Sequence, residues 1–194
     1  RNVPGSVCNK CYAVRLCATR PSVKRGYEVS EFVLRHIASL DRSDAERVQF
    51  VHGLAYQITT ACAKEGERYH RWFDAGDLYS TETLSLIVDI VLLTPEIAHW
   101  LPTRELGIVR RYAQLAGATL ANLSTVLPAN LVVRISSTMI GDTPRDGCEH
   151  TSTVHRKGET ISGHGCPAKY QDGSCGDCRA CWDLAVRNSS YEYH

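Results

Sequence analysis

The 194-residue sequence predicts an α/β fold, in the form of a partial or complete parallel α/β barrel. Three short stretches rich in β-branched or aromatic residues, 69–73, 97–101 and 130–136, have the length of buried strands. Segments with helical spacing of apolar residues separate them. Strands that alternate with helices form βαβ units, which build a parallel sheet with right-handed crossovers. An open doubly wound sheet is the alternative arrangement of the same units.

The helices are predicted from apolar spacing and from residues typical of helix ends. The stretch from Ser43 to Glu46 fits a capping box, and Ser80 is expected to cap a later helix that Pro95 ends. Cys62 lies on an apolar helix face and is expected in the core. Helices are expected over 30–40, 43–66 and 80–95 and around 108–115.

The chain is long enough for one domain with a well-buried core, so residues 1–194 are expected to form a single domain. Within it we expect an N-terminal cysteine loop (1–29), an α/β core (30–140) and a metal-binding segment (141–194). From Gly141 onward the sequence is rich in Gly, Thr, Ser and His and loses its periodicity. This segment is predicted to be irregular and to cross the strand ends, with a short helix over 183–187.

Composition and charge narrow the classes of partner. The formal net charge is +1 and the basic residues are scattered, so general nucleic-acid binding is not indicated. A signal peptide and a long apolar run are not seen, which predicts a soluble cytoplasmic protein without membrane contact. Nine cysteines, gathered mainly towards the two ends, favour metal-bound thiolates in a reducing compartment over disulfides.

The sharpest chemical signal is the C-terminal cysteine run. Cys166, Cys175, Cys178 and Cys181 follow the spacing C-x8-C-x2-C-x2-C, in which two-residue spacers let successive sulfurs turn towards one centre. Pro167 directly follows the first cysteine, as is common beside cluster ligands. The run predicts a [4Fe-4S] cluster held by these four thiolates.

Zinc is the alternative metal, because the first cysteines form a second knuckle. Cys8 and Cys11 could join Cys175 and Cys178 around one zinc ion and tie the two ends of the chain together. If the cluster is present instead, Cys8 and Cys11 either bind a second metal or add ligands to the first. Weaker candidate ligands are Cys17, Cys148 and His164.

The strand ends supply a second candidate site. Asp74 and Asp77 lie in a turn after the first predicted strand, and Arg104 follows the second. Ligands of parallel α/β folds bind at the carboxyl ends of the strands, so these three residues are the candidates for catalysis. Alternatively the acidic residues are ordinary turn residues, and Arg104 is their structural partner rather than a phosphate or carboxylate binder.

Several short motifs together resemble a family of bacteriophage and prophage proteins related to the phage gene product eighty-eight domain. They are Cys-x2-Cys-Tyr-Ala from Cys8, Gly-Asp at 76–77, His-Trp-Leu-Pro-Thr-Arg from His99, Cys-Pro-Ala from Cys166, and Cys-Gly-Asp-Cys-Arg-Ala-Cys-Trp from Cys175. The resemblance implies a phage-encoded iron–sulfur protein in the host cell. The family pattern often has His and Ser where this chain has Phe73 and Ala75, which weakens a proton-transfer role for that turn.

The leading hypothesis is therefore a phage-type iron–sulfur protein with a structural, electron-transfer or redox role and a protein or small-molecule partner that the sequence leaves unknown. A metal-dependent or radical-SAM-like enzyme that uses the strand-end pocket is the first alternative. The usual C-x3-C-x2-C loop of radical-SAM enzymes is absent, and four cysteine ligands would leave iron no open position. A zinc-stapled interaction module is the second alternative.

Overall fold

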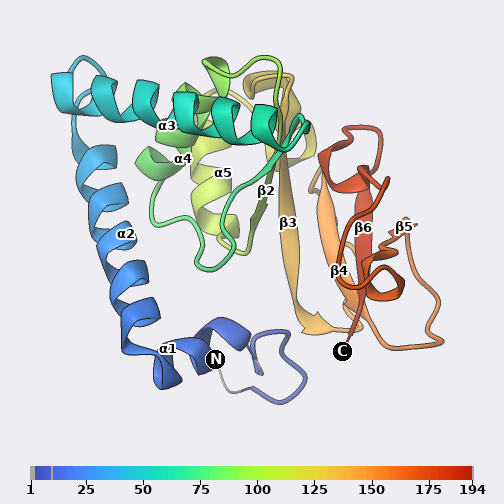
Figure 1. Ribbon diagram of the computed structural model, residues 1–194. Helices are drawn as coiled ribbons and strands as arrows, with labels where there is room; N and C mark the ends of the chain where they lie inside the picture. Colours follow the sequence, from blue (N-terminus) through green and yellow to red (C-terminus); the bar gives the residue numbers. More distant parts are fainter. Residues whose placement is uncertain (1–2, 10, 194) are drawn as a thin grey trace.

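A computed structural model describes residues 3–9 and 11–193 as helices and strands built around one six-stranded sheet (Figure 1). The strand order is β1-β2-β3-β4-β6-β5, and every neighbouring pair is parallel. The sheet curls into a half-barrel, so the partial parallel barrel is the confirmed form of the prediction. The strands are β1 (Tyr69–Arg71), β2 (Ala98–Thr103), β3 (Leu131–Ile140), β4 (Thr151–His155), β5 (His164–Gly165) and β6 (Asn188–Glu192).

The helices gather on one side of β2 and β3, and the C-terminal part of the chain lies on the other side (Figure 1). Helix α4 contacts α2, α3 and α5 and so forms the centre of the helical layer. The α-helices are α1 (Tyr12–Thr19), α2 (Pro21–Ser39), α3 (Ala45–Lys64), α4 (Thr81–Leu92) and α5 (Leu106–Leu115). Three 3₁₀ segments complete the set: η1 (Leu120–Val126), η2 (Ala168–Tyr170) and η3 (Ala180–Trp182).

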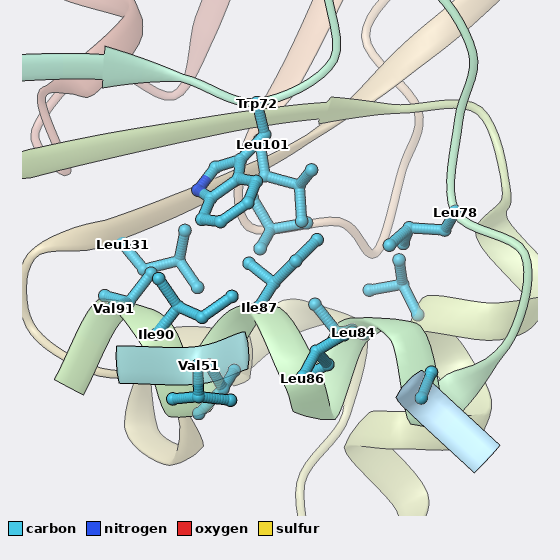
Figure 2. Close-up of a cluster of buried hydrophobic side chains, with 14 of the residues drawn as sticks. Val51, Trp72, Leu78, Leu84, Leu86, Ile87, Ile90, Val91, Leu101 and Leu131 are labelled. Atoms are coloured by element: carbon cyan, nitrogen blue, oxygen red, sulfur yellow. The ribbon is translucent and has the colours of Figure 1, made fainter. Parts of the chain in front are cut away.

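The hydrophobic core lies between the sheet and α4 (Figure 2). Leu84, Leu86 and Ile90 of α4 are completely buried, as is Leu101 of β2. Burying one such side chain stabilises the fold by about 1.5–3 kcal/mol. Cys62 belongs to the same cluster, as its place on an apolar helix face predicted.

The N-terminal segment differs from the predicted loop over 1–29, because it contains α1 and the first half of α2. Residues Tyr12–Thr19 include none that is buried, and α2 buries only Ile37 and Ala38, so neither helix adds much to the core. Two predicted caps had different outcomes. Ser80 caps α4 as expected, whereas Asp44 rather than Ser43 caps α3, with its carboxylate accepting from the Glu46 amide at 2.8 Å.

The C-terminal segment also differs from its prediction. Residues 141–194 were expected to be irregular, but they supply three of the six strands. Strands β4 and β6 are rich in buried hydroxyl groups, and several of these pair across the sheet; the Thr153 hydroxyl, for example, donates to Ser190 at 3.1 Å. Strands of this kind lack the apolar alternation by which strands are recognised. The helix expected over 183–187 is wrong, because a turn there leads into β6.

Candidate metal centre

The C-terminal cysteine segment lies against the face of the sheet opposite the helices. Trp182, at the end of η3, packs edge-on against Trp100 of β2 at 5.3 Å and Tyr69 of β1 at 5.5 Å between ring centroids. Its indole N–H donates to the carbonyl of His70 at 2.9 Å. The indole thus fixes the position of the neighbouring Cys181.

Arg134, in the middle of β3, is the second anchor of this segment. Its side chain is completely buried, and its guanidinium donates to the carbonyls of Ala180 at 2.8 Å, Cys181 at 2.9 Å and Asp183 at 2.9 Å. A charged donor in a buried place is stabilised only when its hydrogen bonds are made. One side chain therefore holds the backbone on both sides of the last cysteine.

The four C-terminal thiols lie within electrostatic reach of one another. Cys166 follows β5 directly, at the carboxyl edge of the sheet. Burial raises the pKa of the Cys166 thiol, and the nearby thiols of Cys181, Cys175 and Cys178 raise it further, while the Ala168 amide lowers it.

The loop between Cys166 and Cys181 is built from tight turns. Gly176 has φ +51°, a left-handed conformation that suits glycine, and the Cys178 amide donates to the Cys175 carbonyl at 2.9 Å. The Cys178 sulfur lies 3.2 Å from the imidazole Nε2 of His164. The structure therefore brings the reserve ligand His164 beside one of the four predicted thiols.

Cys181 is the most buried of the four thiols. Its sulfur lies 3.1 Å from the phenolic oxygen of Tyr191, and the hydroxyl of Ser189 lies beside it without the geometry of a formed hydrogen bond. Burial raises the pKa of Cys181, whereas the two hydroxyls and the Arg134 guanidinium lower it.

All nine cysteines are free thiols in the structure. Across residues 3–9 and 11–193, however, no three His, Cys, Asp or Glu side chains stand in an arrangement that could hold a metal ion. The donor chemistry still fits a cluster, since four thiols lie on one turn-rich segment whose ends are fixed to the sheet. The side chains of Cys175 and Cys178 lie on its exposed loop.

The N-terminal cysteines occupy a different place, at the carboxyl ends of β2 and β3. The backbone of residues 5–7 pairs with the end of β3, where the Val7 amide donates to Thr138 at 3.0 Å and the Ile140 amide donates to Gly5 at 2.9 Å. Cys8 contacts the Arg104 guanidinium, and the Cys11 amide donates to the Cys8 carbonyl at 3.2 Å. Cys17 and Cys148 are half-buried elsewhere, on α1 and before β4.

The strand-end candidates are engaged in structural contacts. The Asp77 carboxylate accepts from the Thr103 hydroxyl at 2.5 Å and from the amides of Arg104 and Leu78 at 2.8 Å each. Three donors use most of its acceptor capacity, so this carboxylate joins the ends of β1 and β2. The structural alternative for Asp77 agrees with this geometry.

Asp74 anchors the N-terminal segment. The Tyr12 hydroxyl donates to the Asp74 carbonyl at 2.8 Å and to its carboxylate at 2.9 Å. Burial and this carboxylate raise the pKa of Tyr12 to about 12. Asp77 and Arg104 thus meet at one edge of the sheet, and each of the three catalytic candidates contacts another part of the chain.

Sequence reasoning missed three residues of the candidate centre: Arg134, Ser189 and Tyr191. Arg134 carries the clearest signal, because it interrupts the apolar run Leu-Val-Val-Arg-Ile of the strongest predicted strand. A charged residue inside a buried strand needs partners, and its presence could have indicated an anchored segment on that face. The two hydroxyl residues gave no comparable signal, because the strand containing them was not recognised.

A comparison with known families identifies the family of the chain. Residues 4–184 match the family model described as GP88, gene product 88. The chain belongs to this family. The match covers all nine cysteines and agrees with the phage resemblance of the sequence motifs. No curated protein and no solved structure matches the chain. Among the described residues of this GP88 protein, no helix is both long and apolar enough to cross a membrane.

Proposed function

We propose that this GP88 protein binds a [4Fe-4S] cluster through Cys166, Cys175, Cys178 and Cys181 and has a structural, electron-transfer or redox role. The observation that carries the proposal is that four cysteines at C-x8-C-x2-C-x2-C lie on one turn-rich segment, which Arg134 and Trp182 fasten to the sheet beside the last of them. When bound, the cluster would supply one-electron chemistry or cross-link the segment. The free thiols favour the reducing cytoplasm of the host cell as its location.

The chain's own residues have defined tasks in this proposal. Arg134 and Trp182 hold η3 against the sheet and so fix the backbone of Cys181. Cys175 and Cys178 lie on the loop between the two anchored ends, where His164 contacts Cys178.

The alternatives gain less support from the geometry. A single zinc ion shared by both knuckles would need Cys8 and Cys178 together, but Cys8 contacts Arg104 while Cys178 contacts His164. An enzyme at the strand ends would need free side chains, but Asp77 already accepts three hydrogen bonds. Metal analysis distinguishes a bound zinc ion from an iron–sulfur cluster.

The test is anaerobic purification of the full chain with iron, sulfide and zinc analysis. We expect about four iron and four sulfide per chain, together with a visible thiolate-to-iron absorption band. Cys178→Ser is expected to lose most of the iron. Cys17→Ser, a matched change on α1 outside the segment, is expected to keep it. A colourless protein with stoichiometric zinc would reverse the assignment.

A further inference from the structure

Two hydrogen bonds join strands of the sheet to candidate ligand sulfurs: His164 of β5 contacts Cys178, and Tyr191 of β6 contacts Cys181, the more buried of the two. Tyr191 belongs to β6, and the phenol reaches the sulfur at 3.1 Å. A tyrosine phenol keeps its proton at neutral pH. A neutral phenol is both a donor and an acceptor.

Metal binding would decide the direction of this hydrogen bond. In the free thiol either group can donate. A sulfur bound to iron has lost its proton and can only accept. The Tyr191 hydroxyl must then donate to Cys181, and no other acceptor competes for its proton in the described structure.

Ser189 supplies a second, unused donor on the same face of β6. Its side chain is completely buried, and its hydroxyl has no hydrogen-bond partner in the described part of the chain. Buried hydroxyls without partners are rare, because each costs desolvation energy that is not recovered. Ser190, between the two, points to the opposite face, where it bonds Thr153 and His155. Residues 189 and 191 therefore share the face that carries Cys181.

We infer that Tyr191, assisted by Ser189, is a positioning residue that sets the reduction potential of the metal centre by donating a hydrogen bond to the Cys181 sulfur. The inference rests on the proposed cluster. Reduction adds negative charge to the cluster and its sulfurs, and a donor to sulfur stabilises that charge. Loss of the donor lowers the potential without removing a ligand.

The experiment compares wild type, Tyr191→Phe and Ser189→Ala, each purified anaerobically as the full chain. Iron content is measured first, and the potential is then found by redox titration of the visible band. For Tyr191→Phe we expect an unchanged iron content and a lower reduction potential. The equilibrium between oxidised and reduced forms should shift about tenfold towards the oxidised form, which is about 59 mV for one electron. Ser189→Ala should shift it in the same direction. Tyr193→Phe, the same chemical change just beyond β6, should leave it unchanged.

The outcomes separate the inference from the proposed function. If the wild-type protein contains no iron and sulfide, the proposed cluster is wrong, and so is the inference that rests on it. Wild type with a cluster, and an unchanged potential in both folded variants, overturns the inference alone. Circular dichroism establishes which variants fold. If Tyr191→Phe does not fold, the potential of Ser189→Ala decides.

Discussion

Replacing Arg134 by methionine tests whether one buried guanidinium holds the cysteine segment on the sheet. The change leaves the carbonyls of Ala180, Cys181 and Asp183 without their donor. Each unpaired buried carbonyl costs about 1–3 kcal/mol. Against this loss, methionine removes the cost of burying a cation, which is several kcal/mol. We expect a net loss of about 2–4 kcal/mol in the free energy of holding the segment in place.

The loss should be local, because Arg134 contacts the segment and not the helical layer. Partial opening of one unit below the free energy of global unfolding is common in proteins. Limited trypsin digestion of the metal-free chain is the assay, since Lys169 and Arg179 lie within the segment. Arg134→Met should be cut there about 30-fold or more faster than wild type, which corresponds to at least 2 kcal/mol.

Arg111→Met is the matched control, since this arginine of α5 is exposed. It should be digested at the wild-type rate. Equal protection of the segment in both variants would refute the anchoring role of Arg134. Global unfolding of Arg134→Met in urea, with no separate local step, would show that the segment and the core form one cooperative unit.

Two further predictions concern the sheet. Asp77→Asn replaces an acceptor oxygen by a donor, so the Thr103 hydroxyl or the Arg104 amide loses its partner; urea unfolding should show a loss of about 1–3 kcal/mol. His99 is completely buried, and burial followed by the charge of His70 lowers its pKa from 6.5 to about 3. Below about pH 6.5 the unfolded chain therefore binds a proton at His99 that the folded chain does not bind. The free energy of unfolding should fall by about 2 kcal/mol between pH 6.5 and 5, as measured by urea unfolding at each pH.

Each of these predictions has its own control. Asp41→Asn changes an exposed carboxylate, so its stability should match wild type within about 0.5 kcal/mol. His99→Asn removes the titrating group, and its stability should depend less on pH over the same range. If the acid sensitivity of His99→Asn equals that of wild type, another group is responsible. An Asp77→Asn variant as stable as Asp41→Asn would show that the carboxylate does not join the strand ends.

The fold from α3 to β3 could be predicted because hydrophobic periodicity dominates there. The strands at 69–73, 97–101 and 130–136 and the helices between them follow from apolar spacing and from Ser80 at a helix start. The last third could not, since β4 and β6 bury hydroxyls instead of apolar groups. A pair such as Thr151 and Asn188, 2.8 Å apart, is stable only when both strands are already paired. That condition is not visible in either strand alone.

In the candidate site, too, local sequence patterns predict some residues and not others. The spacing of four cysteines predicts the candidate ligands, because ligand spacing is a local property of the chain. The residues that position them are remote in sequence: Arg134 lies 47 residues from Cys181, and Trp182 bonds a carbonyl 112 residues away. Contacts of this range depend on the strand order, which the sequence did not predict for the C-terminal third.

The position of the cysteine segment follows from the polarity of the sheet face beneath it. A face made of apolar side chains would hold the segment by burial alone and would allow it to slide. Arg134, Ser189 and Tyr191 instead present directional groups, each beside the backbone or sulfur of Cys181. Hydrogen bonds fix distance and direction where apolar contact fixes neither. The buried polar face therefore costs stability, and in return it holds the Cys181 sulfur at a defined place.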